Sequence, residues 1–299
     1  MALDKLAASV DKNYLAFYLK KRGFYDVITG SAQPQIIRQN LISIKIPLPP
    51  FPIQQKIADI LDRAGALIEQ RKAQIAKLEL LVKSQFVEMF GDPVKNPMGW
   101  DSGTIRDIVT EVKYGTSKPA NEGGQYLYLR MNNITYDGYL DLSSLKHIDV
   151  PGNEIEKYIV RKGDVLFNRT NSKELVGKTC VFDLDEPMVI AGYIIRIRLN
   201  QRAIPAYLSA TLNSEYGKQT LRSMCKAIVG QANINAQELQ DIAILIPPLA
   251  LQTQFATFVE RVEAQKVRLR KGLGLMEMGY KALMQKCFEG EIGSPSQLR

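Results

Sequence analysis

An internal repeat constrains the fold of this chain more than any other feature of its sequence. The segment "IPLPPFPIQQKI" at 46–57 returns as "ILIPPLALQTQF" at 244–255. Shorter matches precede both copies, since "YLAFYL" resembles "YLSATL" and "GSAQPQI" resembles "GQANINA". A repeat of this kind indicates a duplicated structural unit, so we expect the same local structure twice.

Each copy continues into a long helical pattern. Seam positions from Ile57 to Met89 alternate spacings of four and three, which is a heptad pattern, and adding 198 to each number gives the positions from Phe255 to Cys287. A span of about 35 residues rises roughly 50 Å and needs a packing partner along its length. An ordinary helical hairpin is the alternative, but two helices in matching phase favour an intramolecular coiled coil. The prolines before each helix end a globular unit, because proline fits neither a strand ladder nor a helix interior.

The region between the two helices predicts a separate domain. "GDPVKNPMGW" at 91–100 is rich in Gly, Pro and Asn and reads as a linker. Short β-rich runs then alternate with turns, and helical stretches follow near 204–226. The fold class is therefore α+β, with one globular mixed α/β domain and two long helices. The first 50 residues match only the last third of that domain.

Composition excludes several classes of protein. No run of 18 apolar residues occurs, and charged residues interrupt the first twenty positions, so we expect a cytoplasmic protein that does not enter a membrane. Cys180, Cys225 and Cys287 have no metal-binding spacing, and His147 is the single histidine, so we expect reduced thiols and no metal site. The net charge is +8, but residues 101–202 hold 14 basic and 14 acidic side chains. A polyanion would therefore be held by local basic clusters.

Catalytic motifs are incomplete. "PLPPF" contains the Pro-Pro-Phe of amino-methyltransferases without the preceding Asn or Asp that would accept the target amino group. "SKELVGKT" at 172–179 approaches a phosphate-binding loop, but Ser172 replaces its first glycine and an expected strand follows in place of a helix. We therefore predict no catalytic residue and no cofactor for this chain.

Taken in order, several segments resemble one known family. They are "IPLPPFPIQQKIADIL", "FVEMFGDP", "RKGDVLFNRTNS" and "IPPLALQTQF" with the later "CFEGEIG". Together they resemble the specificity (S) subunit of type I restriction-modification systems. Such subunits carry two target-recognition domains, each reading half of a bipartite DNA site, held apart by two antiparallel helices that also dock two modification subunits.

The resemblance implies a division of this chain. The expected parts are a C-terminal remnant of a first target-recognition domain (1–50), a central spacer helix (51–90), a linker (91–99), a complete target-recognition domain (100–250), an antiparallel C-terminal spacer helix (251–289) and a tail (290–299). It departs from the family in lacking most of the first recognition domain. Two chains, or this chain and another S polypeptide, would then combine to supply two recognition domains.

The implied function is a non-catalytic DNA-recognition and assembly subunit. Its partners would be double-stranded DNA, the modification (methyltransferase) subunits and, through them, the restriction subunit. Base flipping and methyl transfer from S-adenosylmethionine would belong to the modification subunits. The alternative is a coiled-coil adaptor whose globular domain binds protein. A compact nuclease or methyltransferase ranks last, because its site residues do not assemble.

DNA contact requires Arg and Lys for phosphates and guanine, Asn and Gln for adenine, and Ser and Thr as adaptable partners. The loop at 161–179 supplies these residue types densely, and solvated polar turns are the alternative explanation for it and for the other segments. The predicted DNA-binding residues are Lys113, Thr116, Lys118, Arg130, Asn132, Asn133, Arg169, Thr170, Asn171, Ser172, Lys173, Lys178, Gln231 and Asn233.

Overall fold

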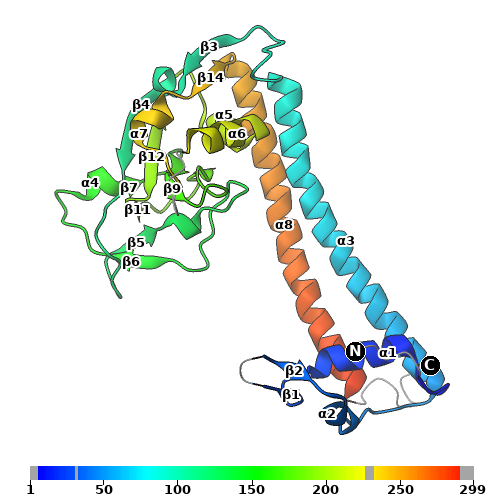
Figure 1. The fold of residues 1–299 in the computed structure, drawn as a ribbon. Coiled ribbons are helices and arrows are strands. Elements are labelled where there is room, and N and C mark those ends of the chain that lie inside the picture. Colours follow the sequence, from blue (N-terminus) through cyan, green and yellow to red (C-terminus); the bar gives the residue numbers. More distant parts are fainter. Residues whose placement is uncertain (1–5, 31–32, 226–231, 290–299) are drawn as a thin grey trace. The chain divides into compact units, whose positions relative to one another are not determined.

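The structure is a computed structural model that describes residues 6–30, 33–225 and 232–289. It divides into two compact units, which are described separately. Unit 1 comprises Met1–Leu78 and Ala264–Arg299, and unit 2 comprises Glu79–Glu263. Figure 1 shows that unit 2 contains nearly all of the β-structure.

Helices α3 (Phe51–Phe90) and α8 (Leu249–Phe288) contain 40 residues each and contribute to both units. Their bounds differ by the 198 residues that the repeat predicts. Within unit 1, Lys72 of α3 lies 3.7 Å from Glu277 of α8. Within unit 2, the rings of Phe90 and Phe255 are 5.4 Å apart. Late residues of α3 thus meet early residues of α8, so the helices are antiparallel (Figure 1).

The heptad seam is confirmed by burial. Every predicted seam position of α3 and α8 is buried or half-buried, whereas most positions between them are exposed. Leu61 and Phe255 are fully buried, and so is Lys266, the seam position that corresponds to Ile68. The predicted intramolecular coiled coil and the α+β fold class are therefore both confirmed.

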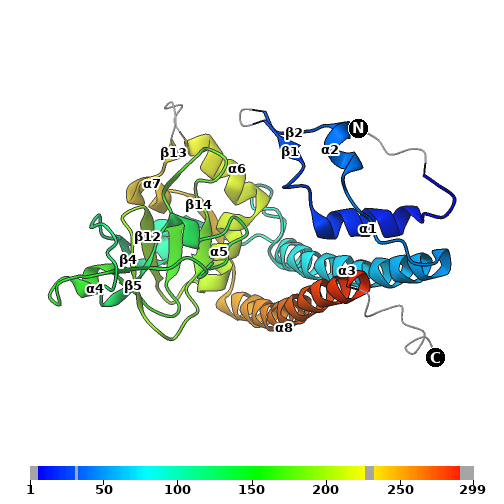
Figure 2. The same cartoon turned by 90° about the horizontal axis from the view of Figure 1, so that it is seen from below.

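Unit 1 is small and mostly helical. Its core joins Tyr14, Ile57, Leu61 and Cys287, so α1 packs against the start of α3 (Figure 1 and Figure 2). The thiol of Cys287 is buried, as expected for a structural cysteine. Besides the two long helices, unit 1 contains α1 (Lys12–Arg22), β1 (Ile28–Thr29), β2 (Gln35–Ile36) and α2 (Arg38–Ile42).

Unit 2 contains two four-stranded sheets, ordered β10-β8-β12-β4 and β6-β5-β11-β7, and two two-stranded pairs, β13-β9 and β14-β3. The pairing of β5 with β11 is parallel, and the other pairings between these strands are antiparallel. The strands are β3 (Asp101–Thr104), β4 (Val109–Tyr114), β5 (Tyr126–Leu129), β6 (Lys146–Ile148), β7 (Ile159–Val160), β8 (Val165–Asn168), β9 (Thr170–Asn171), β10 (Thr179–Val181), β11 (Met188–Ile190), β12 (Ile194–Leu199), β13 (Ala232–Asn233) and β14 (Ala243–Ile246).

Short helices join these strands, and several of them cover the first sheet. The main core packs Phe167 and Ile195 from that sheet against Leu208 and Leu212 of the helix that follows it. The helices are η1 (Ile105–Ile108), η2 (Met131–Asn133), α4 (Ile155–Tyr158), α5 (Pro205–Asn213), α6 (Glu215–Met224) and α7 (Ala236–Gln240).

A buried ion-pair cluster stabilises the β4–β12 pair. Arg196 is fully buried, with its guanidinium 2.5 Å from the carboxylate of Glu111, and Arg198 lies 2.9 Å from Asp164. Burial alone would raise the pKa of Glu111, but hydrogen bonds from Lys113 and Arg196 lower it below its usual value. Because a buried arginine left without its carboxylate is costly, these charges hold the sheet in register.

The repeat is a structural duplication at the level of single hydrogen bonds. In unit 1, buried Gln54 accepts from the Asp11 backbone N–H (2.9 Å) and donates to the carbonyl of Pro49 (2.8 Å). In unit 2, buried Gln252 accepts from the Ile204 N–H (2.9 Å) and donates to the carbonyl of Pro247 (2.8 Å). Each glutamine satisfies backbone groups that the prolines leave unpaired, and thereby anchors the start of one long helix.

Candidate nucleic-acid interface

The ends of several strands of unit 2 meet at one edge. In the first sheet Asn168 pairs with Ile194, and Ile195 pairs with Tyr114. The end of β8, the start of β12 and the end of β4 are therefore neighbours. In the second sheet Ile190 pairs with Leu129, so the residues after β5 reach the same place. The loops that follow these strands were predicted separately from the sequence, and the tertiary structure brings them together.

The turn between β11 and β12 joins the two sheets at this edge. The Ala191 N–H donates to the carbonyl of Leu129 (2.9 Å), and the Gly192 N–H donates to the carbonyl of Thr116 (2.7 Å). A Cβ added to Gly115 would lie 2.1 Å from the carbonyl oxygen of Ile190. Only glycine allows such close backbone contact, so packing requires glycine at position 115.

Asn168 organises the loop that follows β8. Its side chain is fully buried, donates to the carbonyl of Met131 (3.3 Å) and accepts from the Thr170 N–H (3.2 Å). The ammonium of Lys178 donates to the same carbonyl at 2.7 Å. Buried polar groups whose hydrogen bonds are all satisfied make a site rigid. These hydrogen bonds therefore hold η2 and the β8–β9 connection in fixed positions relative to each other.

Arg169 stands at the centre of the edge. Its guanidinium carbon lies 4.8 Å from the ring centre of Tyr114, a cation–π contact. The next residue, Thr170, donates its hydroxyl to the side-chain oxygen of Asn233 at 2.9 Å. The β9–β13 pair thus places Asn233 beside Arg169, although 64 residues separate them in the sequence.

The predicted residues differ in accessibility. Exposed ones are Lys113, Lys118, Asn132, Lys173 and Asn233, and half-buried ones are Arg130, Arg169, Asn171 and Ser172. Four are buried and bonded within the protein, namely Thr116, Asn133, Thr170 and Lys178. Gln231 lies outside the described residues.

Several predicted cations already have partners. Lys113 lies 2.5 Å from Glu111, and Lys118 lies 3.0 Å from Glu154. Arg130 donates to the carbonyl of Ser144 at 2.9 Å. Such exposed ion pairs are weak and can exchange for a phosphate. Lys173 is exposed on the turn after β9. It takes part in none of the ion pairs between described residues, so it can bind a phosphate without first leaving a carboxylate.

Aromatic residues at the edge are absent from the set of DNA-binding residues predicted from the sequence. Tyr114 and Tyr193 are 40% and 55% exposed, and Tyr136 accepts a hydrogen bond from Arg222. Tyr114 lies in a segment that the sequence marks as a candidate loop, but the expected contact types were charged, amide and hydroxyl side chains, so no tyrosine was included in the predicted set. We use the term polar edge for the accessible group of side chains here: Tyr114, Arg130, Asn132, Arg169, Lys173, Tyr193 and Asn233.

Two buried lysines lie beneath this region. Burial lowers the pKa of Lys178, and it lowers the pKa of Lys218 to about 8, with an opposing contribution from Asp137. The ammonium of Lys218 lies 4.7 Å from the ring centre of Tyr136. These cations add positive potential under the polar edge while remaining too buried for direct contact with a ligand.

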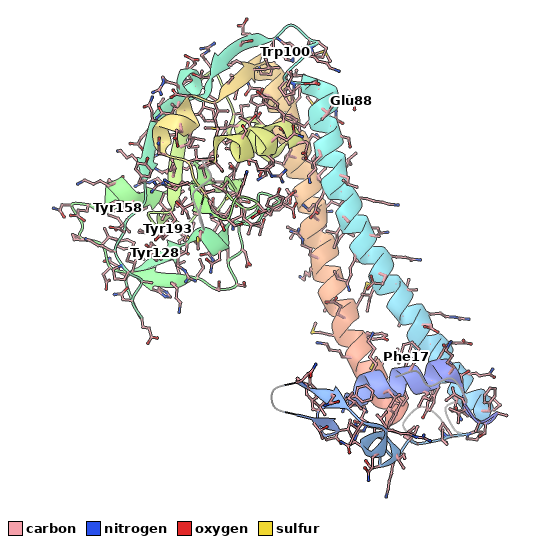
Figure 3. All side chains as sticks on the ribbon, viewed as in Figure 1. Phe17, Glu88, Trp100, Tyr128, Tyr158 and Tyr193 are labelled. Atoms are coloured by element: carbon pink, nitrogen blue, oxygen red, sulfur yellow. The ribbon has the colours of Figure 1, made fainter. Side chains whose placement is uncertain are left out.

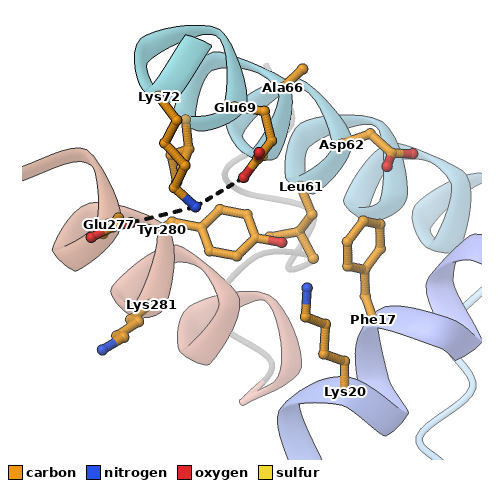
Figure 4. A pocket seen from close by; sticks show the side chains of 12 residues that line it. Phe17, Lys20, Leu61, Asp62, Ala66, Glu69, Lys72, Glu277, Tyr280 and Lys281 are labelled. Carbon is orange, nitrogen blue, oxygen red and sulfur yellow. Dashed lines mark hydrogen bonds and ion pairs between the residues drawn. The ribbon is translucent and has the colours of Figure 1, made fainter. Parts of the chain in front are cut away.

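The cavities of unit 1 have different chemistry. One of about 650 Å³, between α1 and the long helices, is lined by three lysines and three carboxylates, and Lys72 bridges Glu69 and Glu277 (Figure 4). Its charges balance, so it offers no site for a polyanion. A second cavity, of about 710 Å³, is almost wholly apolar, with Leu15, Leu41 and Ile44 among its lining residues.

The described residues show no group of three His, Cys, Asp or Glu side chains placed to hold a metal ion. In the same part of the chain, none of the helices has the length and apolarity needed to span a membrane. The strand expected after the segment 172–179 is confirmed, because Thr179 begins strand β10 where a phosphate-binding loop would begin a helix.

Comparison with known proteins identifies the family. The model of the type I restriction modification DNA specificity domain matches residues 5–80 and 97–274. The chain belongs to this family. Its two matched segments cover both copies of the internal repeat.

Curated relatives agree with this assignment. The type I restriction enzyme EcoKI specificity subunit of Escherichia coli (strain K12) is 24% identical over 83% of this chain and 58% of its own length. The MjaVIII specificity subunit of Methanocaldococcus jannaschii is 26% identical over 97% of this chain and 72% of its own length. The chain spans between 46% and 66% of the first three curated relatives that it matches.

Solved structures support the fold. The type I restriction-modification system S subunit from M. genitalium aligns with a TM-score of 0.55 at 15% identity, covering 94% of this chain and 73% of its own. A chain from a structure of type I system assembly aligns with a TM-score of 0.57 at 20% identity, covering 92% and 67%. The fold of this chain is therefore similar to the folds of these two structures.

Proposed function

We propose that this specificity-family chain reads part of a bipartite DNA sequence through the polar edge and docks methyltransferase subunits, without an active site of its own. The observation that supports this function is the convergence of four loops at one edge of the sheets. Arg169, Asn132 and Asn233 present there the guanidinium and amide groups that recognise guanine and adenine. The chain would act in the cytoplasm, where its DNA substrate is accessible.

The proposed partners follow from this assignment. Modification subunits would bind along the exposed faces of α3 and α8 and would supply S-adenosylmethionine chemistry, and the restriction subunit would join through them. Exposed apolar side chains support such docking, since Leu80, Val87 and Leu275 lie outside the seam and are 62%, 59% and 59% exposed.

The deciding experiment measures DNA binding by the full chain assembled with its modification subunits. Bound duplexes are selected from a random library, and the affinity for the selected sequence is then measured against salt concentration. We expect a steep loss, because each neutralised phosphate contributes about 0.9 to the slope of log K against log salt. A protein-binding adaptor would show neither sequence enrichment nor this slope.

Variants assign the binding to the polar edge. Arg169→Ala and Lys173→Ala should each weaken binding about tenfold, as expected for losing a base or phosphate contact. Lys162→Ala is the matched control, because Lys162 is exposed, pairs with Asp185, and lies beyond the opposite end of β8. If Arg169→Ala and Lys173→Ala bind DNA with the same affinity as Lys162→Ala, the polar edge does not belong to the DNA interface.

A second recognition surface would come from another specificity polypeptide or from a second copy. The apolar cavity of unit 1 supports this pairing, because the repeat relates its lining residues to buried core residues of unit 2. Leu15, Leu41 and Ile44 correspond to Leu208, Leu239 and Ile242, which pack beneath the first sheet of unit 2. Among the described residues of unit 1, the two-stranded β1–β2 ribbon is the only β-structure, and Leu41 and Ile44 remain half-buried.

A further inference from the structure

The polar edge contains one exposed aromatic side chain without a hydrogen-bond partner among the described residues. Tyr193 is 55% exposed, and in the described part of the chain its side chain makes no hydrogen bond or ring contact. Figure 3 labels it together with Tyr128 and Tyr158. Tyr128 behaves differently, since it is 4% exposed and donates its hydroxyl to the carbonyl of Thr116 at 3.2 Å.

The backbone at Tyr193, in contrast, is firmly held. Its carbonyl accepts from the Arg169 N–H at 3.0 Å. The two preceding residues, Ala191 and Gly192, donate to the carbonyls of Leu129 and Thr116. The turn closes on itself, because the Ile194 N–H donates to the carbonyl of Ala191 at 2.8 Å. Connections from three other segments thus fix the point from which the ring projects.

The neighbours of Tyr193 suit a nucleic acid. Arg169 is bonded directly to its carbonyl, and the Arg169 guanidinium rests on the ring of Tyr114. A large aromatic side chain on a rigid turn loses little conformational entropy when it stacks, since its backbone is already ordered. Aromatic rings stack on bases without regard to sequence, and inserted side chains unstack the neighbouring base step.

We propose that Tyr193 inserts its ring between two stacked base pairs of the bound DNA. The chain would then recognise how easily one base step unstacks, in addition to the hydrogen-bonding groups on the base edges. This inference rests on the proposed function. It makes Tyr193 a specificity-determining residue that favours flexible pyrimidine–purine steps at the point of insertion, because these unstack at the lowest cost.

The test uses the full chain assembled with its modification subunits and the duplex selected from a random library. The fluorescent base 2-aminopurine is placed at successive positions that exclude the methylated adenine. We expect fluorescence to rise at one step on binding to the wild type and to Tyr193→Phe. Tyr193→Ala should abolish that rise and weaken binding roughly 5- to 150-fold, the range that corresponds to loss of one stacked base.

The control variant is Tyr25→Ala, which removes a 92% exposed tyrosine from unit 1. It should keep both the affinity and the fluorescence of the wild type. Unchanged affinity and fluorescence in Tyr193→Ala would overturn the insertion, and so would equal loss in Tyr193→Phe and Tyr193→Ala, which would indicate a hydroxyl contact. Failure of the wild type to bind any duplex would instead contradict the proposed function itself.

Discussion

At the scale of single residues, the strongest evidence for the duplication is the pair Gln54 and Gln252. Their exposed fractions are 1% and 0%, and each donates to the carbonyl of the first proline of a pair and to a carbonyl far upstream, that of Ser9 or Arg202. Tyr14 and Tyr207 show the same correspondence, since they donate their hydroxyls to the carbonyls of Pro47 and Leu245 at 2.8 Å. The matching glutamines and tyrosines were visible in the sequence, but their hydrogen-bonding roles were not.

Gln252→Ala should lower the free energy of unfolding by about 3 kcal/mol, because it leaves several buried backbone groups without a partner. Urea unfolding followed by circular dichroism measures the change. Gln254→Ala is the control, since Gln254 is exposed on the same helix and should shift stability by less than about 0.5 kcal/mol. Equal effects of the two variants would show that the hydrogen bonds of Gln252 do not stabilise the start of α8.

Lys218 should make stability depend on pH. Its pKa is lowered to about 8 in the folded protein, whereas in the unfolded chain it is near 10.4. Between these values the unfolded chain binds more protons, so the free energy of unfolding should rise with pH by up to about 1.4 kcal/mol per unit from this residue. Lys218→Met should remove that rise between pH 8 and 9.5 in urea titrations. Persistence of the same slope in the variant would contradict the assignment.

At the scale of elements, the heptad pattern predicted α3 and α8 well. Periodicity is a local property, and a 40-residue amphipathic helix has few alternative ways to bury its apolar stripe. The strands of unit 2 were harder to predict. "MVIAGYIIRIRL" reads as one β-rich run, but Ala191–Tyr193 divides it into β11 and β12, which belong to different sheets. Hydrophobicity alone does not distinguish the two sheets.

Leu61→Ala should lower the free energy of unfolding by about 3 kcal/mol, since Leu61 is fully buried in the core of unit 1. Leu67→Ala is the matched control, because Leu67 lies on the same helix and is 55% exposed. Thermal and urea unfolding of both variants measures the difference. Similar stabilities would mean that the seam does not contribute to the stability of this helix pair.

At the scale of the whole molecule, the duplication is unequal. Adding 198 maps α2 (Arg38–Ile42) onto α7 (Ala236–Gln240), as it maps α3 onto α8. The two four-stranded sheets, however, occur in unit 2 alone among the described residues. In the function that we propose, one polar edge reads one part of a two-part site, so we expect a second specificity polypeptide in the assembled complex.

Sedimentation of the chain with its modification subunits should therefore reveal two specificity polypeptides in each complex. Ile28 lines the apolar cavity of unit 1. Ile28→Asp should reduce the number of specificity polypeptides to one, because the second polypeptide would have to bury the new carboxylate when it binds there. Val94→Asp is a control on an exposed residue of the linker. A complex with one specificity chain that still recognises both parts of its DNA site would contradict the pairing.

The sequence by itself determined the repeat, the paired long helices, the mixed α/β domain between them and the family, because each of these follows from order and spacing along the chain. The tertiary structure alone decided which polar residues are accessible. Arg169 and Thr170 are adjacent, yet one lies on a tyrosine ring at the surface and the other is buried against Asn233. Strand register decides which of the two side chains is buried, because it sets the contacts between residues that are far apart in the chain. The composition of the loop does not predict these contacts.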